Sequence, residues 1–379
     1  MKKKIIRITT VPVSLNVLLK GQLRYIQNHY EVIAVSGSGT DLVEVERREG
    51  VRIFPIEMHR TISPLKDISS IYQFYKFLKK EKPFIVHSHT PKAGFVAMIA
   101  SYLAGVPNRL HTVAGLPLME TRGIKRRILL IVEKLTYFLS TLILPNSYGL
   151  KDFIIKNRLT SEDKLKILGN GSSNGIDLTY FQSSIATRTE SYSIIEKYGL
   201  DDKLIFLFIG RIVSHKGIEE LLNAFAQINN KHQHTILLLV GDLEDFLYPL
   251  STETKQNLLH PCVIRVGYQT DIRCYLELAD IFVFPTYREG FPNVVLQACA
   301  FNLPCIVTDV AGCNEIIQNN ENGILIPPKD TEKLAEAMEF LTLNTKIRKE
   351  LGEGNRRGVE KKFQQPVIWE LLLNLYNSL

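Results

Sequence analysis

Residues 281–298, IFVFPTYREGFPNVVLQA, are the stretch from which the fold can be read. The run IFVF is short and wholly apolar, which is typical of a parallel strand covered on both faces. The run that ends the stretch begins a helix, and Pro292 suits its first turn, where the missing N–H would have no partner. The loop between them carries Glu289 to a helix amino terminus, which has about half a positive charge and binds anions. A carboxylate beside an anion site suits a ligand with hydroxyls at one end and phosphate at the other, such as a sugar nucleotide.

Apolar runs alternate with helical patterns on both sides of this stretch. The runs expected to form strands are 4–10, 31–36, 51–55, 84–88, 109–113, 141–145, 204–209, 235–240, 262–266, 281–284, 305–308 and 324–326. The helical patterns fall near 15–28, 40–49, 67–81, 92–104, 123–139, 147–157, 216–230, 271–278, 293–302, 331–343, 345–361 and 366–379. This alternation predicts an α/β fold with a doubly wound parallel sheet in each half, and ligands bound beyond the carboxyl ends of the strands.

A polar segment between the two halves is predicted to be a connector. Residues 169–175, GNGSSNG, are rich in glycine but lack the strand before and the helix after that a dinucleotide fingerprint requires. The polar stretch 182–202 is expected to end the connection. We therefore expect one domain over 1–180 and a second over 181–365.

A second loop in the carboxyl-terminal half has residues suited to phosphate. It reads GRIVSHKG over 210–217 and follows the strand expected at 204–209. An Arg can clamp two phosphate oxygens, whereas Lys acts as a point charge, and both are most effective where water is excluded. No D-x-D pair, whose two carboxylates could hold a divalent ion, occurs in the sequence.

These residues resemble the signature of the retaining glycosyltransferases of family 4. The family pattern is Glu, seven residues, Glu, written around E-G-F-P; here Glu289 fills the first acidic position and Gln297 replaces the second. Family members use the second carboxylate to hold the nucleotide ribose, and an amide bonds a hydroxyl without the help of charge. The run GRIVSHKG resembles the G-R-x4-K-G element whose Arg and Lys neutralise the donor diphosphate. The run VGDLE around Asp242 is a weaker match.

The resemblance implies the GT-B fold, with two Rossmann-like domains facing a cleft and the segment 366–379 crossing back to the first domain. It also implies that the first domain binds the acceptor and the second the nucleotide sugar, with no cofactor and no metal. The catalytic residues would be Arg211, Lys216 and Glu289. The residues that would bind the donor are Gly210, Gly217, Gly267, Tyr268, Gly290, Phe291, Pro292, Asn293 and Gln297.

Three residues near strand ends of the first half are expected on the acceptor side: Ser14, His89 and Gly115. The run HTPKAG that includes His89 resembles the capsule and lipid-linked-sugar branch of the family. A metal ligand, a residue that lines a cleft and a structural loop histidine are the alternatives for this side chain. Many family members carry T-x-H-G where this chain has TVAG at 112–115, so the histidine that contacts the donor is missing. His111 is expected to be a buried or edge histidine rather than its substitute.

Charge is divided unevenly along the chain. Residues 1–180 hold 27 Lys and Arg against 14 Asp and Glu, whereas residues 181–379 hold 19 against 25. The helical pattern at 123–139, GIKRRILLIVEKLTYFL, combines basic residues with a broad apolar surface, which is the composition of an interfacial helix. A helix packed on the sheet with a solvated basic end is the alternative, and charge that only aids solubility is another. We expect an anionic membrane surface as partner and no nucleic acid, because no aromatic-interleaved RNA-binding motif or zinc-finger spacing occurs.

Cysteine spacing and hydropathy indicate the compartment. The five cysteines include no C-x-x-C pair, which fits buried thiols in a reducing environment. The first residues have the basic flank of a signal peptide but too short an apolar run, and the apolar zone 128–144 is interrupted by Glu133 and Lys134. We therefore expect a cytoplasmic protein, peripheral to the inner face of the plasma membrane.

The function implied is a retaining, metal-independent glycosyl transfer. The donor would be a nucleotide sugar, by default a UDP-sugar of a hexose or N-acetylhexosamine, and the acceptor a polyprenyl-diphosphate-linked saccharide of capsule or O-antigen synthesis. A UDP-sugar 2-epimerase on the same fold is one alternative, which needs carboxylates for proton transfer and no acceptor site. A non-catalytic polyanion-binding protein is the other, motivated by the basic first half.

Overall fold

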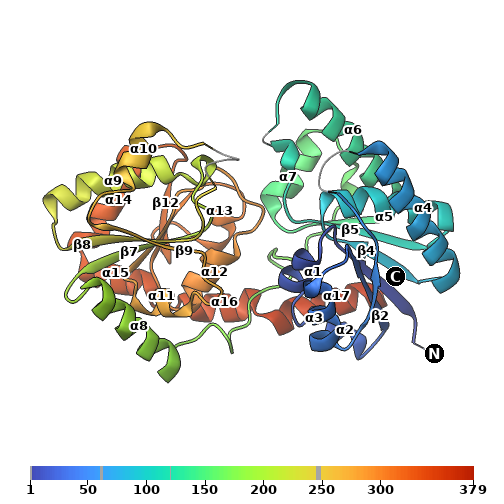
Figure 1. Ribbon diagram of the computed structural model, residues 1–379, viewed down its shortest axis with the longest axis horizontal. Helices are drawn as coiled ribbons and strands as arrows, with labels where there is room; N and C mark the ends of the chain where they lie inside the picture. Colours follow the sequence, from blue (N-terminus) through green and yellow to red (C-terminus); the bar gives the residue numbers. More distant parts are fainter. Residues whose placement is uncertain (1, 60–62, 120, 245–248) are drawn as a thin grey trace. The chain divides into compact units, whose positions relative to one another are not determined.

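The chain forms two compact units, each described here by itself. The first comprises Met1–Gly175 and Gln365–Leu379, and the second comprises Ile176–Gln364. The computed structural model describes residues 2–59, 63–119, 121–244 and 249–379. Each unit contains a six-stranded parallel sheet with helices packed against it (Figure 1). The doubly wound α/β architecture predicted for each half is therefore confirmed.

The sheet of the first unit has the strand order β3-β2-β1-β4-β5-β6, and all the pairs are parallel. Its elements are β1 Lys4–Ile8, α1 Pro12–Leu18, α2 Gln22–Gln27, β2 Glu31–Ser36, α3 Thr40–Glu49, β3 Arg52–Pro55, α4 Pro64–Glu81, β4 Ile85–Ser88, α5 Pro91–Ala104, β5 Asn108–Val113, α6 Gly123–Leu139, β6 Leu142–Pro145, α7 Tyr148–Lys156 and α17 Gln365–Asn377. Successive residues of β1 serve opposite faces. Ile5 packs in one core with residues of α1, α2, α3 and α17, and Ile6 packs in another with residues of α4 and α5.

The sheet of the second unit has the order β12-β11-β10-β7-β8-β9, which is the same winding. Its elements are α8 Ile185–Tyr198, β7 Leu204–Ile209, α9 Ile218–Lys231, β8 Thr235–Val240, α10 Thr252–Asn257, β9 Val263–Gly267, α11 Arg273–Leu278, β10 Ile281–Phe284, α12 Asn293–Ala300, β11 Cys305–Thr308, α13 Cys313–Ile316, β12 Gly323–Ile326, α14 Thr331–Leu343, α15 Thr345–Gly352 and α16 Asn355–Phe363. The strands β7, β8 and β10 are buried along their whole length, as their unbroken apolar runs predict.

Glycines divide two of the helices that were predicted as single segments. The pattern at 15–28 forms α1 and α2, with Gly21 between them at a φ of 80°. The pattern at 345–361 forms α15 and α16, with Gly354 between them at a φ of 86°. A positive φ ends an α-helix and is readily adopted only by glycine, so these two residues set the breaks.

The stretch 182–202, which was expected to end the connection and was not predicted to be helical, contains a helix. Most of it forms α8, whose first turn is closed by a capping box between Ser184 and Thr187. Gly199 ends the helix in the left-handed conformation. The polar composition hid the helix because only a few of its residues, such as Ile194, are buried. Ser184, a preferred N-cap residue, was a signal that the sequence contained.

The last helix, α17, belongs to the first unit and lies beside α2 (Figure 1). The indole Nε1 of Trp369 donates to Asn174 Oδ1 over 2.7 Å, and the hydroxyl of Tyr376 shares a 2.5 Å hydrogen bond with Nδ1 of His87. The helix is thus fixed to the sheet by polar contacts as well as by its buried apolar face. Across the described part of the chain, none of the helices combines the length and the apolar character needed to span a membrane.

Candidate active site in the second unit

The two loops with the charged motifs meet at the point where the strand order of the second sheet reverses. β7 and β10 are neighbours in the sheet although two strands and three helices separate them in sequence. Their helices therefore diverge to opposite sides, which leaves space beyond the carboxyl ends of the strands, where ligands bind in such folds. The loop 210–217 follows β7, and the loop 285–292 follows β10.

The backbones of these two loops lie in direct contact. Gly217 has a φ of 71°, and a Cβ at this position would lie 2.0 Å from the carbonyl oxygen of Pro285. The N–H of Tyr287 donates to the carbonyl oxygen of His215 over 3.0 Å. Only glycine permits so close an approach, so Gly217 sets the distance between the lysine and the glutamate that the loops carry.

Lys216 and Glu289 form an ion pair between Nζ and Oε1. Both side chains are about 15% exposed, so the pair is largely shielded from water yet reachable by a ligand. The hydroxyl of Thr286 lies 3.0 Å from the same Oε1, and the ammonium group of Lys216 lies 5.1 Å from the ring centre of Phe284. Thr286 is fully buried and was not singled out in the sequence, where no spacing distinguishes it.

Arg211 lies at the start of the same loop in a more open position. Its Nη1 donates to Oε2 of Glu244 over 2.9 Å, and 48% of its side chain is exposed. Burial, and then the charges of Lys216 and Arg211, lower the pKa of His215 to about 4, so this imidazole is neutral at physiological pH. The loop thus carries two positive groups with a neutral histidine between them in sequence.

Asp242 orients the end of the neighbouring strand. Its Oδ1 accepts the N–H of Tyr268 over 3.1 Å, and Gly267 has a φ of 71°. The ring of Tyr268 is 68% exposed. Gly210 lies next to β8, because a Cβ of Gly241 would lie 2.0 Å from its carbonyl oxygen. These contacts place Gly210, Gly267 and Tyr268 at the carboxyl edge of the sheet.

The helix α12 begins where it was predicted to begin, but Pro292 precedes its first turn instead of belonging to it. Pro292 is the N-cap residue and the helix begins at Asn293, which is exposed. Phe291 is buried, with its ring centre 5.3 Å from that of Phe363. A Cβ at Gly312, in the loop after β11, would lie 2.5 Å from the carbonyl oxygen of Gly290. The loop with the glutamate is therefore held on both sides, by the loops after β7 and after β11.

The Oε1 atom of Gln297 is buried and has no hydrogen-bond partner among the described residues. The residue lies in the second turn of α12 and is partly exposed as a whole. A buried amide oxygen without a partner is costly, so it is suited to accept a hydroxyl of a bound ligand.

The three residues expected on the acceptor side have different surroundings in the first unit. Ser14 lies within α1 and is half-buried, and Gly115 follows β5 with open space where a Cβ would stand. His89 is only 4% exposed, and its Nε2 accepts from Nε of Arg7 over 2.9 Å. His89 is thus enclosed within the first unit by the polar side chains around Arg7, and its acceptor-side role stays a prediction. His111 is buried, as expected, with Nδ1 2.8 Å from the hydroxyl of Ser88.

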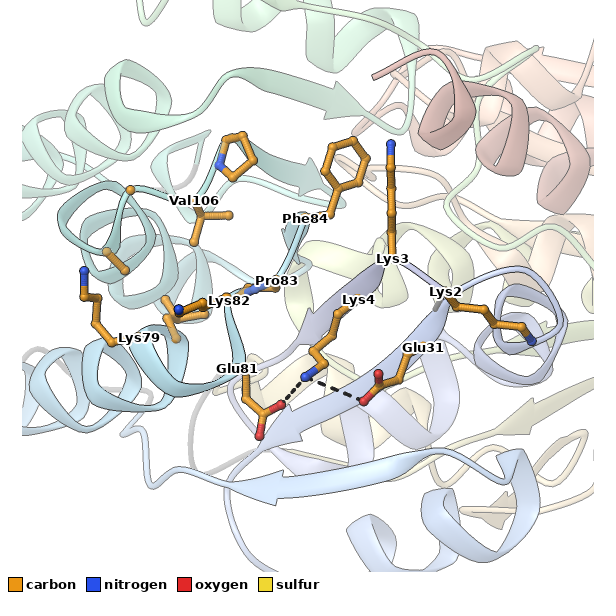
Figure 2. Close-up of a pocket in the computed structure, with 14 residues that line it drawn as sticks. Lys2, Lys3, Lys4, Glu31, Lys79, Glu81, Lys82, Pro83, Phe84 and Val106 are labelled. Atoms are coloured by element: carbon orange, nitrogen blue, oxygen red, sulfur yellow. Dashed lines mark hydrogen bonds and ion pairs between the residues drawn. The ribbon is translucent and has the colours of Figure 1, made fainter.

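A cavity of the first unit lies at the opposite edge of its sheet from the carboxyl ends. It has a volume of about 650 Å³ and is lined by the amino end of β1, by Phe84 before β4 and by the ends of α4 and α5 (Figure 2). The ammonium group of Lys4 bridges Glu81 and Glu31 in its wall. Its acidic groups are thus neutralised within the protein, and no strand end delivers a catalytic side chain to it.

Metal ligands do not cluster in the part of the chain that the structure describes. No group of three or more His, Cys, Asp or Glu side chains is close enough there to hold an ion. The loop after β7 places the positive charges of Arg211 and Lys216 at this edge of the sheet.

The chain is similar to known proteins over nearly its whole length. Residues 191–358 match the model of the family Glycosyl transferases group 1, and residues 8–146 match that of Glycosyl transferase 4-like. The capsular polysaccharide biosynthesis glycosyltransferase CapM of Staphylococcus aureus is 35% identical over 385 residues, which cover 99% of this chain and 97% of CapM. The UDP-Gal:alpha-D-GlcNAc-diphosphoundecaprenol alpha-1,3-galactosyltransferase of Escherichia coli is 31% identical over 317 residues, 81% of this chain and 78% of the relative.

Solved structures share the fold at lower identity. Anabaena Alr3699/HepE in complex with UDP superposes with a TM-score of 0.82 at 17% identity, over 100% of both chains. The sucrose-phosphate synthase of Thermosynechococcus elongatus gives a TM-score of 0.80 at 20% identity, over 100% of this chain and 99% of the other.

Proposed function

This chain belongs to the glycosyltransferases of group 1, and from that membership we propose that it transfers a hexose or N-acetylhexosamine from a nucleotide sugar to a polyprenyl-diphosphate-linked saccharide. The resemblance to retaining family 4 and the expected GT-B fold of two Rossmann-like units are confirmed. The named relatives include a capsular enzyme and an enzyme whose printed name specifies a UDP-sugar donor and a diphosphoundecaprenol acceptor. A UDP-sugar and a lipid-linked acceptor are therefore the proposed substrates.

The pairing of Lys216 with Glu289 at the switch point is the observation that carries the proposal. In the transfer the bond between the anomeric carbon and the diphosphate oxygen breaks, and its electron pair stays on the diphosphate. Arg211 and Lys216 then meet the developing negative charge, which fixed cations stabilise strongly where water is excluded. The guanidinium clamps two oxygens and the ammonium acts as a point charge.

Glu289 is proposed to hold the donor sugar through its hydroxyl groups. Its Oε1 already receives two contacts, from Lys216 and from the hydroxyl of Thr286, so the carboxylate is fixed before a substrate binds. A fixed acceptor of hydrogen bonds orients the sugar at little entropic cost. The hydroxyl of the acceptor forms the new bond at the anomeric carbon, and its proton passes to an oxygen of the leaving diphosphate. Retention of configuration follows from family membership.

We propose that no metal takes part, because the two positive groups of the loop after β7 supply the charge that a divalent ion would supply in other enzymes. Activity should persist with EDTA in excess over all divalent ions. Loss of activity in EDTA that manganese restores would contradict this part of the proposal. Chelator-treated enzyme given magnesium is the matched control.

The first unit is proposed to bind the lipid-linked acceptor at an anionic membrane surface, and α6 carries this part. Five apolar residues are exposed along one stripe of the helix at a spacing of three to four residues: Ile124, Ile128, Ile131, Leu135 and Phe138. Ile124, Ile131 and Phe138 are 76%, 68% and 73% exposed. A soluble helix rarely leaves such a stripe uncovered, whereas an interfacial helix buries it among lipid tails.

Basic residues beside the stripe supply the attraction to anionic lipids. Lys125, Arg127 and Lys134 are exposed on α6, whereas Arg126 bonds the carbonyl oxygen of Leu118. The neighbouring helices continue the surface, because α4 packs on α5 and α5 on α6. On α4, Leu65 is 85% exposed. Each basic residue near an anionic surface contributes about 1 kcal/mol.

Vesicle binding tests the membrane part of the proposal by itself. The protein should co-sediment with phosphatidylglycerol vesicles at low salt and be released as salt is raised. Ile131→Glu with Phe138→Glu should abolish this binding. Ile185→Glu with Tyr192→Glu, two exposed apolar residues of α8 in the second unit, should leave it unchanged. No binding by the wild type would remove the membrane from the proposal.

Donor and acceptor are identified by following nucleoside diphosphate release from a panel of nucleotide sugars, with and without a lipid-linked saccharide. Release that depends on the acceptor supports transfer. Interconversion of the donor sugar without an acceptor would favour the 2-epimerase, and no reaction with any donor would favour a polyanion-binding protein. The named relatives are glycosyltransferases, so neither alternative gains support from them.

A further inference from the structure

One face of the first sheet changes from apolar to polar toward the carboxyl ends of its strands. On β1 the apolar Ile5 is followed on the same face by Arg7, and on β4 Ile85 is followed by His87. Arg7 and His87 are register partners, and both are buried. Nε2 of His87 shares a 2.7 Å hydrogen bond with the hydroxyl of Thr112 on β5. A row of polar side chains is thus enclosed within the unit.

Arg7 is positively charged and forms no ion pair with a carboxylate among the described residues. It is 0% exposed, its Nε donates to Nε2 of His89, and its Nη2 donates to Oε1 of Gln22. Its Nη1 is buried and has no hydrogen-bond partner among the described residues. A guanidinium stays protonated in proteins, and a buried charge without a counter-charge costs several kcal/mol.

The hydrogen bond from Arg7 decides the tautomer of His89. A guanidinium N–H can only donate, so Nε2 of His89 accepts and the neutral ring carries its proton on Nδ1. Burial, and then the charges of His87, Arg7 and His111, hold the pKa of His89 well below its ordinary value, so the ring is neutral. Within the described part of the chain, the Nδ1–H of His89 and the hydroxyl of Ser173 are also buried without partners.

These three residues line one small cavity. Its volume is about 10 Å³, which is enough for one water molecule or one monatomic ion and too little for a phosphate group. Gln22 and Asn146 also line it, and the Oδ1 of Asn146 is buried without a hydrogen-bond partner among the described residues. No Asp or Glu is among the lining residues. A water molecule would accept hydrogen bonds from the unpartnered donors but would not neutralise the charge of Arg7.

We propose that this cavity binds one small monovalent anion, of the size of chloride. Nη1 of Arg7 supplies the charge, and the Nδ1–H of His89 and the hydroxyl of Ser173 are the further donors. The anion removes the cost of the buried cation and partners groups that are otherwise unsatisfied. This site is separate from the proposed transfer chemistry, which takes place in the second unit.

The cavity is lined by residues from the two segments by which the chain leaves the first unit and later returns to it. Ser173 lies just before the dividing point at Gly175, and Leu372 of α17 also lines the cavity. Nε2 of Gln22 donates to the carbonyl oxygen of Ser173 over 3.1 Å, which holds this segment against the cavity. Bound anion is therefore expected to stabilise the first unit together with the docking of α17.

Thermal unfolding at constant ionic strength tests the proposal. Protein exchanged into sodium gluconate is titrated with sodium chloride or bromide in place of gluconate. A saturable rise in Tm of about 3 °C or more is expected from either halide, since a ligand that binds only the folded state stabilises it by mass action. Arg7→Met, which keeps the length of the side chain and removes the charge, should abolish the rise.

Arg109→Met is the matched control, because Arg109 is a partly buried arginine of the same sheet that bonds backbone oxygens away from the cavity. It should keep the full halide response. No halide response in the wild type, or an equal response in Arg7→Met, would overturn the proposal. A wild-type crystal soaked in bromide gives an answer that does not depend on the variants folding. An anomalous peak beside Arg7 is expected, and a cavity without one would overturn the proposal.

Discussion

The two units share one sheet topology and use its switch point differently. In the second unit the loops after β7 and β10 present Lys216 and Glu289, each about 15% exposed. In the first unit the loops after β1 and β4 bond to each other, because the N–H of Thr10 donates to Oγ1 of Thr90 over 2.9 Å and their hydroxyls lie 2.7 Å apart. Strand order thus decides where a site can lie, and the exposure of charged side chains distinguishes the two switch points.

The largest effect on activity is expected from replacing the charged side chains that are proposed to contact the donor. Lys216→Ala and Glu289→Ala should each lower kcat/KM for nucleoside diphosphate release at least about a hundredfold, because each removes several kcal/mol of transition-state interaction. Lys231→Ala, which breaks an ion pair with Glu339 on the surface of α9, should leave activity unchanged. Wild-type rates in either site variant would mean that the chemistry lies elsewhere.

The contact between the loops of the second unit should be nearly as sensitive. Gly217→Ala would place a methyl group 2.0 Å from the carbonyl oxygen of Pro285 in a left-handed conformation, so the free energy of unfolding should fall by at least about 3 kcal/mol. Gly199→Ala has a similar φ of 61° but nothing within 4 Å, and should cost about 1 kcal/mol. Urea unfolding of both variants measures the difference. Equal losses would show that the loops can move apart freely.

The buried titratable groups of the first unit should affect stability rather than catalysis. Burial raises the pKa of Glu133 to about 7 from 4.5, so the folded state keeps this carboxyl protonated after the unfolded chain has lost its proton. The contribution of Glu133 to the free energy of unfolding is therefore fully present below pH 4.5 and is lost as the pH rises toward 7. Above pH 7 this contribution no longer changes with pH. Glu133→Gln should gain about 2–3 kcal/mol relative to the wild type between pH 4.5 and 7.

Comparing Glu133→Gln with the wild type separates the effect of Glu133 on stability from the effects of the buried histidines. Burial lowers the pKa of His111 to about 4, so its contribution is lost as pH falls from 6.5 toward 4, which is the opposite sign. Both chains contain His111, so its effect cancels in the difference of their unfolding free energies. A difference that does not change with pH would contradict the placement of Glu133 within the core.

The smallest effect is expected at Gln297. Its unpartnered Oε1 is proposed to accept a hydroxyl of the nucleotide ribose, and a carboxylate would accept the same bond more strongly. Gln297→Glu should therefore lower the KM for the donor about three- to tenfold with little change in kcat. A raised KM would place the ribose away from α12.

Much of this architecture could be predicted from the sequence. The apolar runs predicted strands such as 204–209, 235–240 and 281–284 with the observed bounds, because a strand buried on both faces is mostly apolar. The motif residues Lys216 and Glu289 were found, since their spacing resembles a known signature. Their mutual contact could not be predicted, because the approach of two loops at Gly217 is a property of the folded backbone.

Other features depend on tertiary contacts that no local pattern shows. Thr286 contacts Glu289 only because the loop after β10 turns back, and His89 is enclosed because α17 and the segment before Gly175 cover it. The sequence contains one local signal of the buried polar cluster. Arg7 interrupts the inward-facing positions of an apolar strand, which indicates a buried charge that needs a partner.

A crystal structure with bound nucleoside diphosphate, together with its atomic contacts, would decide whether fixed cations receive the leaving group. We expect oxygens of the diphosphate within about 3 Å of the guanidinium of Arg211 and the ammonium of Lys216, with the nucleotide beside α12. A diphosphate bound away from both side chains, or held through a metal ion, would contradict the mechanism.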